Sequence, residues 1–427
     1  MAVPLRKLIA TVGSVGAANL VAALTGFVIM VVLAAKLPPA SNAEFLVFWS
    51  VLFWVYGGVG GVQYEAVRSV RGTRSAVAES STPVSTGARV VPVALGVAAA
   101  AVGLFFLSSL IWAPRVFPQD PYLLSGVIAV GGLLFAGHSA VIGTLGGQGR
   151  WPAAAILIAG ESLGRFLALM GLVLLGCQLL PLKMVVPVGG LVWVVAVGVA
   201  PRFRRVWRVR ADVSAPVFAR NATQTMVANV ASAALVVGFP TVLGLMIGHE
   251  AIQTIPGLLF AISMTRAPLM LPLNAFQSML VAHFVANHRG GFLVKVVLGC
   301  AGVGLVLAAI VAVVGPPLLG LLRPEYHMSA LVLAGLTLDA TALALISVTG
   351  TFVLATKRHG WYMLGWLAAI AASVGFLAAG INLEWRVVIA LLVGPAIGAG
   401  LHLAAVRRSG QPSVNQRDVG SGEVAKA

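Results

Sequence analysis

The chain has very few charged residues. Asp, Glu, Lys and Arg together make up 9% of its 427 residues, whereas apolar residues make up 59%. A soluble protein of this length needs a far more polar surface. Hydrophobic stretches of about 18 or more residues recur along the whole chain, and each is long enough to cross a hydrocarbon core of about 30 Å. Because only helices and closed barrels satisfy the backbone in lipid, the composition predicts an all-α membrane protein with no separate soluble domain.

Cysteines and catalytic motifs are also scarce. The two cysteines, Cys177 and Cys300, fall near opposite faces in the topology below, so we expect no disulfide and no metal site built from them. The sequence contains no P-loop, GxSxG, HExxH or CxxC motif. Residues 36–43 hold Lys36 but not the acidic pair that membrane glycosyltransferases usually need. We therefore expect neither an enzyme nor a cofactor.

Hydropathy predicts about twelve transmembrane helices. We place them at 10–35, 43–64, 90–112, 122–145, 153–176, 184–200, 222–247, 252–272, 293–315, 328–354, 361–381 and 386–405. The first apolar stretch is too long for a signal-peptide core, so we interpret it as an uncleaved span.

The basic residues predict the orientation. Of the 26 Lys and Arg residues in loops and tails, 21 fall on the side of both termini and five on the other: Lys36, Arg115, Lys183, Arg323 and Arg386. Such an excess marks the cytoplasmic side. This scatter over short loops also argues against nucleic-acid binding, despite a formal net charge of +16. The Ala, Gly, Val and Arg bias is typical of a high-GC bacterial genome, so we predict a multi-pass protein of the bacterial cytoplasmic membrane.

A weak internal repeat suggests two halves. Arg115 and Arg150 flank the fourth span and are 35 residues apart, as are Arg323 and Arg358 around the tenth span, at an offset of 208 residues. Parallel repeats of this kind occur in transporters, although any two helix pairs of similar length would give the same spacing. We expect six-helix bundles at 1–200 and 222–406, a basic cytoplasmic linker at 201–221 and a disordered cytoplasmic tail at 407–427.

Charged side chains inside predicted spans are the first candidates for a site, because each costs about 2.5–3.5 kcal/mol to insert. Glu161 and Arg165 are four residues apart on one helical face. They can pair, either as neutralised packing or as part of a substrate or proton site. Arg266 precedes Pro268, which we expect to break its helix. An Arg there favours an anion such as phosphate; the alternative is an Arg that snorkels to the interface.

Three further ionisable residues are weaker candidates. Asp339, near the middle of the tenth span, could pair with Arg165 or Arg266 or carry a coupling proton. Glu65 and Arg68 end the second span. We interpret them mainly as an interface anchor pair that would stand at the cytoplasmic mouth of a cavity.

Several short motifs follow one another along the chain. The opening stretch runs from Asn19 to Leu33-Ala-Ala-Lys-Leu37 and on to Glu44-Phe45 and Phe48-Trp49-Ser50. Two later stretches are Gly146 to Trp151 with Glu161 to Arg165, and Arg266-Ala-Pro268. In this order the motifs resemble those of bacterial polysaccharide-export flippases of the multidrug/oligosaccharidyl-lipid/polysaccharide exporter superfamily, although the turn Lys36-Leu-Pro-Pro39 departs from the family's R-x-L-G-P pattern.

The resemblance implies two six-helix bundles around a central cavity and translocation of a polyprenyl-diphosphate-linked sugar by alternating access. Arg266, Arg165, Arg68 and Asn19 would then bind substrate, and Glu161, Asp339 or Glu65 would couple an ion. Expected partners are the glycan substrate, membrane lipids and the glycosyltransferases or polymerase of the same pathway. Two alternatives remain open, a proton- or sodium-coupled drug antiporter and a non-transporting scaffold for cell-wall enzymes.

Overall fold

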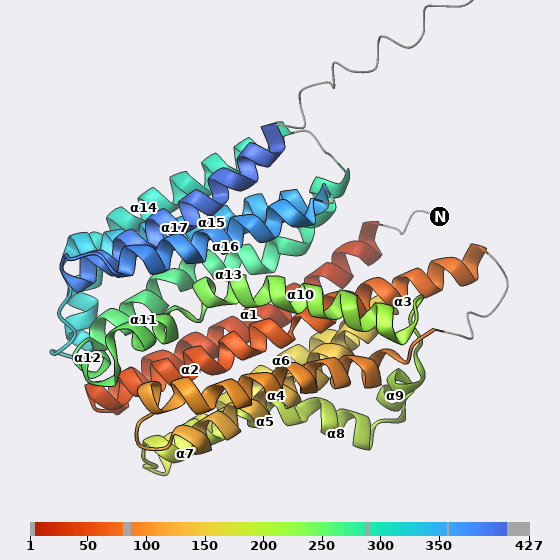
Figure 1. Cartoon of the computed structure of the whole chain (residues 1–427), viewed down its shortest axis with the longest axis horizontal. Helices are drawn as coiled ribbons and strands as arrows, with labels where there is room; N and C mark the ends of the chain where they lie inside the picture. Colours follow the sequence, from red (N-terminus) through yellow and green to blue (C-terminus); the bar gives the residue numbers. More distant parts are fainter. Residues whose placement is uncertain (1–4, 80–86, 287–289, 357, 408–427) are drawn as a thin grey trace, which may run out of the picture.

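A computed structural model describes residues 5–79, 87–286, 290–356 and 358–407 of the chain, with side chains at most of these positions (Figure 1). The tail predicted to be disordered, from Arg407 onward, therefore lies almost wholly outside the described residues. The first half contains α1 (Leu5–Lys36), α2 (Pro39–Val59), α3 (Gly61–Glu79), α4 (Val90–Val116), α5 (Pro121–Gly147), α6 (Trp151–Leu174), α7 (Leu179–Val185), η1 (Val186–Leu191), α8 (Val192–Val199), α9 (Pro201–Arg204) and η2 (Arg205–Arg208). The second half contains α10 (Ala215–Val236), α11 (Phe239–Ile247), α12 (His249–Gln253), α13 (Pro256–Ala286), α14 (Gly290–Leu322), α15 (Ala330–Ala355), α16 (His359–Leu377) and α17 (Leu383–Arg407).

These helices confirm the prediction of an all-α multi-pass membrane protein. Within the described ranges, ten helical segments are long and apolar enough to cross a membrane, and the bent pair α10–α11 makes an eleventh. The 31-residue helix α13 occupies the place of the remaining predicted span. The second span is longer than expected, because α2 and α3 form one segment from Pro39 to Arg74.

The long helices lie roughly parallel in two groups (Figure 1). Helices α14 to α17 pack on one another, and α13 packs on α15. Helices α1 to α8 form the other group, in which α1 packs against α6 and α5 contacts both α3 and α4. Several contacts connect the groups: α1 and α2 both contact α13, and α10 contacts both α3 and α16. The division into bundles at 1–200 and 222–406 stays a prediction, and the predicted linker 201–221 includes the first turns of α10.

The seventh span is broken, and the eighth is not. The axes of α10 and α11 differ by 72° across residues 237 and 238. By contrast, α13 continues on both sides of Pro268, so the predicted helix break at this proline is wrong. Prolines are tolerated inside transmembrane helices because neighbouring groups satisfy the freed backbone atoms.

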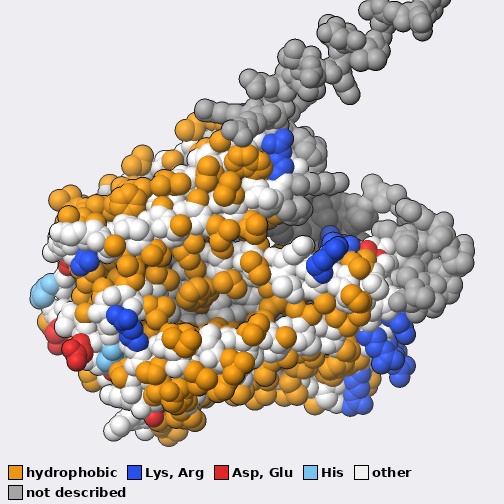
Figure 2. Space-filling model, in the orientation of Figure 1, with side chains coloured by type: hydrophobic (Ala, Val, Ile, Leu, Met, Phe, Trp, Pro, Cys, Tyr) orange, Lys and Arg blue, Asp and Glu red, His pale blue; other side chains and the backbone are white. Residues whose placement is uncertain are grey.

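The two ends of the molecule differ in charge. We call the end that carries the start of α1 the terminal face and the opposite end, with α7 and α12, the far face (Figure 1). Figure 2 shows several Lys and Arg side chains gathered at the terminal face, whereas acidic and histidine side chains accompany fewer basic ones at the far face. This asymmetry follows the positive-inside pattern. The cytoplasmic position of the terminal face stays a prediction.

Candidate functional site

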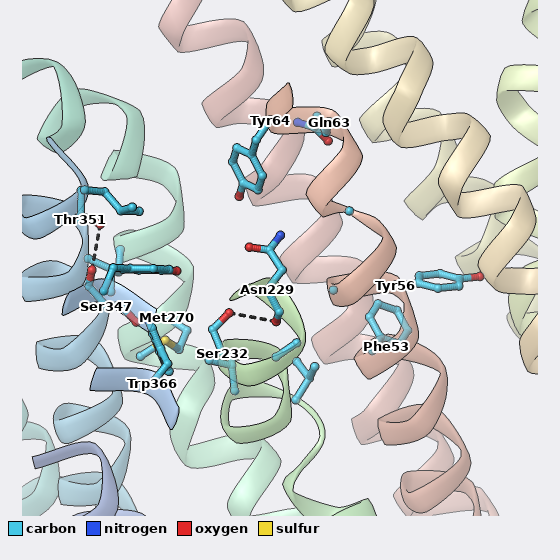
Figure 3. Close-up of a pocket in the computed structure, with 18 of the residues that line it drawn as sticks. Phe53, Tyr56, Gln63, Tyr64, Asn229, Ser232, Met270, Ser347, Thr351 and Trp366 are labelled. Atoms are coloured by element: carbon cyan, nitrogen blue, oxygen red, sulfur yellow. Dashed lines mark hydrogen bonds between the residues drawn. The ribbon is translucent and has the colours of Figure 1, made fainter. Parts of the chain in front are cut away.

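A cavity of about 440 Å³ lies between the two groups of helices. Its described lining comes from α2, α3, α5, α10, α13, α15 and α16, so both halves of the chain contribute (Figure 3). The lining includes the first turn of α16 and the last turns of α15, which stand near the terminal face. The aromatic lining residues are Phe53, Tyr56, Tyr64, Phe135, Tyr362 and Trp366, and the polar ones besides tyrosine are Gln63, Asn229, Ser232, Ser347 and Thr351.

The cavity wall is aromatic and uncharged. None of the described residues that line it carries a charge. The rings of Tyr56 and Phe135 stack with centroids 4.2 Å apart, and Figure 3 shows the Asn229 amide extending toward Tyr64. Such a wall offers flat ring faces beside amide and hydroxyl groups that both donate and accept hydrogen bonds.

The predicted pair of Glu161 and Arg165 lies behind this wall. Arg165 Nη1 donates to Glu161 Oε1 at 2.5 Å, and both side chains are buried on α6. The Arg165 guanidinium also lies over the Phe53 ring, 4.9 Å from its centroid. Because Phe53 faces the cavity, Arg165 acts on the site through an aromatic ring, a cation–π contact. The expected pairing of Glu161 with Arg165 is therefore observed, and the choice between a packing role and a role in the site stays a prediction.

Arg266, the predicted anion-binding residue, donates hydrogen bonds to the helix break after α10. Its Nη1 donates to the backbone carbonyls of Leu235 and Val236, at 2.9 and 2.8 Å. These carbonyls end α10 and lack partners within their own helix, and a cation at a helix C-terminus is favourable. Arg266 is buried and is absent from the described lining of the cavity.

Asp339 is the only acidic group that acts on Arg266 among the described residues. The two side chains interact electrostatically. They form no direct ion pair, so their charged atoms lie more than 4.0 Å apart. Both Asp339 carboxylate oxygens and the Arg266 Nε and Nη2 atoms are buried without a hydrogen-bond partner. This buried, incompletely paired couple lies between α13 and α15, one on each helix.

Glu65 and Arg68 form a polar network on α3. Arg68 donates two hydrogen bonds to Glu65, at 2.7 and 2.6 Å, and also contacts Asp212 at 3.1 Å. Asn221 on α10 donates to the same Glu65 carboxylate at 3.2 Å. Arg68 is half exposed and stands one helical turn beyond Tyr64, which lines the cavity. The network thus joins α3 to α10 beside the cavity, near its terminal-face end.

The structure does not bring the seven predicted site residues together. Asn19 is half-buried on α1 and is not part of the described cavity lining. The sequence analysis singled out none of the residues Gln63, Tyr64, Asn229 and Trp366, which face the cavity. A cluster of amides and aromatic residues in neighbouring spans was the available signal. The roles proposed for the charged residues stay predictions.

At the far face, hydrogen bonds between described residues of the two halves close the molecule. Arg323 at the end of α14 donates to the carbonyls of Ala34, Ala35 and Leu37, at 3.0, 2.9 and 2.7 Å. Asn42 on α2 donates to the Tyr326 hydroxyl at 2.8 Å, and burial raises the pKa of Tyr326, which keeps this hydroxyl protonated. Deeper along the helices, Ser50 bonds Thr241 at 2.8 Å. These contacts join the two halves of the chain on the far side of the cavity.

Comparison with known proteins identifies close relatives and a shared fold. No protein-family profile matches the chain. It is 32% identical over 406 residues to uncharacterized protein Rv3630 of Mycobacterium tuberculosis, and 31% identical over 404 residues to uncharacterized protein Rv1510 of the same organism. Each alignment covers 93% of this chain and 92% of the relative.

Solved structures with the same fold are transporters. An outward-facing multidrug resistance MATE family transporter of the MOP superfamily matches with a TM-score of 0.64 at 14% identity, over 93% of this chain and 95% of that one. An inward-facing conformation of such a transporter gives 0.62 at 12% identity, over 92% and 93%. The eukaryotic MATE transporter AtDTX14 gives 0.64 at 13% identity, over 94% and 96%. The chain therefore belongs to the family of Rv3630 and Rv1510 and has the fold of MATE transporters of the MOP superfamily.

Proposed function

We propose that this protein is an alternating-access transporter that moves a lipid-linked saccharide across the membrane. The observation that carries the proposal is the uncharged wall of aromatic, amide and hydroxyl groups around a cavity between the two halves of the chain. Sugars present apolar ring faces beside many hydroxyls. Aromatic side chains can cover such faces, while Gln63 and Asn229 exchange hydrogen bonds with the hydroxyls.

Arg68 is the predicted cation best placed to meet a diphosphate. It is half exposed and follows Tyr64 by one turn toward the terminal face. Arg68 already contacts two acidic residues, Glu65 and Asp212, which would have to share it with the diphosphate. A guanidinium has five N–H donors, so it can contact all three groups. In this arrangement the sugar occupies the cavity, the diphosphate lies near its rim and the polyprenyl tail stays in lipid. Arg165 and Arg266 then support the wall and the helix break.

Coupling to an ion, if present, falls to the buried carboxylates predicted from the sequence. Glu161 is already paired with Arg165, and Glu65 is held by Arg68. Asp339, whose oxygens have no hydrogen-bond partner, is the most available of the three for a proton or a cation.

Flipping in reconstituted vesicles tests the proposal. Purified protein is placed in liposomes with a labelled polyprenyl-diphosphate sugar, and the sugar that reaches the other leaflet is measured with an impermeant sugar-modifying enzyme. We expect Asn229→Leu to reduce the flipping rate about 5- to 150-fold, since a lost hydrogen bond with a group left unsatisfied costs about 1–3 kcal/mol. Val230→Leu, next along α10 and on the face away from the cavity, should keep the parental rate. Parental flipping by the Asn229 variant would refute the assigned site.

Drug antiport is the second candidate, because aromatic faces also bind organic cations and the fold is that of MATE transporters. In the same vesicles, a pH- or sodium-driven accumulation of a fluorescent cation without flipping would favour this alternative. The predicted partnership with glycosyltransferases or a polymerase belongs to the flippase proposal and not to the drug-antiport alternative.

A further inference from the structure

A second polar cluster lies at the far face and centres on Glu44 of α2. We call Glu44, Lys183, His249 and Gln253 the Glu44 cluster. Lys183 Nζ lies 3.2 Å from Glu44 Oε2, and Gln253 Nε2 donates to Glu44 Oε1 at 2.8 Å. His249 Nε2 lies 3.6 Å from the same Oε1 atom and 3.1 Å from Gln253 Nε2. The carboxylate is thus contacted from two sides by three side chains.

The cluster joins the two halves of the chain. Glu44 and Lys183 come from α2 and α7, whereas His249 and Gln253 lie on the short helix α12, which packs against α2. The Glu44 and Lys183 side chains are only 12% and 7% exposed. A buried carboxylate is costly unless charge-assisted hydrogen bonds stabilise it. Any motion that moves α12 away from α2 therefore removes the Gln253 hydrogen bond that helps to stabilise the buried Glu44 carboxylate.

The described residues of this cluster leave little open space between them. The hollow that Glu44, Lys183 and His249 line together with Asp120 measures about 20 Å³, which is room for roughly one water molecule. The cavity between the halves lies instead toward the terminal face. The structure therefore combines a closed far face with a cavity toward the opposite side, as one state of an alternating-access cycle does.

From this geometry we propose that Glu44 is the latch of the far-face gate. The hydrogen bond that Glu44 accepts from Gln253, with His249 3.6 Å away, holds α12 against α2, and Lys183 orients the carboxylate from within its own half. Breaking the Gln253 bond across the halves shifts the population toward a state open at the far face. This assignment rests on the proposed transport cycle but not on any particular substrate, so it can fail or hold independently of sugar flipping.

Accessibility of the cavity from each face tests the latch. Cys177 and Cys300 are replaced by serine, and Ser347→Cys places a thiol in the cavity wall. An impermeant maleimide is added to the far face or to the terminal face, which a tag on the C-terminus identifies. Labelling from the far face samples the minor open population. With Glu44→Gln we expect this rate to rise about tenfold, equivalent to about 1.4 kcal/mol, and labelling from the terminal face to fall.

Glu250→Gln is the matched control, because it makes the same change on the exposed neighbour of His249. Gln253→Ala is a second route to the same loss and leaves the carboxylate in place. If both variants act through one contact, the double variant Glu44→Gln/Gln253→Ala labels no faster than the faster single variant. Far-face labelling of Glu44→Gln at the rate of Glu250→Gln would overturn the proposal, as would additive effects in the double variant.

Discussion

Replacing Arg266 with methionine should destabilise the protein by about 3 kcal/mol. The substitution removes the donor for the Leu235 and Val236 carbonyls, at 2.9 and 2.8 Å, and each carbonyl left buried and unsatisfied costs roughly 1–3 kcal/mol. It also leaves the Asp339 carboxylate without its neighbouring cation, which adds to the loss. These losses are partly offset, because the buried guanidinium no longer has to be desolvated.

The neighbouring carboxylate determines how much of this loss can be recovered. Asp339→Asn alone should cost about 1 kcal/mol, since Arg266 keeps both carbonyl bonds while the amide replaces a buried charge. The double variant should be more stable than the sum of the single losses implies, by at least about 1 kcal/mol. Arg266→Lys should fall between the parent and the methionine variant, because an ammonium keeps the charge but not the planar fork.

Equilibrium unfolding in mixed detergent and dodecyl sulfate micelles measures these differences, with Arg205→Met at an exposed position as the control for loss of an arginine. If the Arg266 and Asp339 losses add within about 0.5 kcal/mol, the two charges are not coupled and the reasoning is refuted.

Two other predictions concern packing and the buried pair on α6. Gly61→Ala should destabilise the protein by about 1–3 kcal/mol, because its Cβ would lie 2.5 Å from the backbone nitrogen of Met226 on α10. The control Gly96→Ala, with nothing within 4 Å of the new Cβ, should be neutral or stabilising by up to about 1 kcal/mol, and the reverse order of the two variants in an unfolding measurement would contradict the α3–α10 contact. Glu161→Gln should lower the free energy of unfolding more than the double variant Glu161→Gln/Arg165→Met does, because the single change leaves a buried guanidinium without its carboxylate. A double variant at least as unstable as the single one would show that the pair is not the relevant interaction.

The spans could be predicted from the sequence, but the connections between them could not. Span positions follow from the length of apolar stretches, which the bilayer thickness determines. The break after Val236 has no such signal, because its carbonyls are satisfied by Arg266, which lies 30 residues later in the sequence. The proline that the sequence offered as a break, Pro268, lies inside a continuous helix. Local sequence reports local propensity, whereas a membrane helix can break wherever another helix supplies the donor.

The site was harder to predict than the fold for a similar reason. Charged residues such as Arg165 attract attention because burying them is costly, yet that cost is met here by a partner on the same helix. Neutral residues such as Trp366 and Tyr64 give no comparable signal, because the same residues occur on faces toward lipid or within packed helices. Only the arrangement of seven helices shows that they surround one space.

The far-face contacts have a strength that suits a gate. Two involve a charged group, Glu44 with Gln253 and Arg323 with the end of α1, and two are neutral, Asn42 with Tyr326 and Ser50 with Thr241. With roughly 1.5–3 kcal/mol for each charged contact and 0.5–1.5 kcal/mol for each neutral one, the closed state gains about 4–9 kcal/mol. A ligand that reverses a population from 1:99 to 99:1 must prefer one state by about 5.5 kcal/mol. The bias is therefore large enough to keep the far face closed at rest, and toward its lower end a ligand preference of about 5.5 kcal/mol is enough to open it.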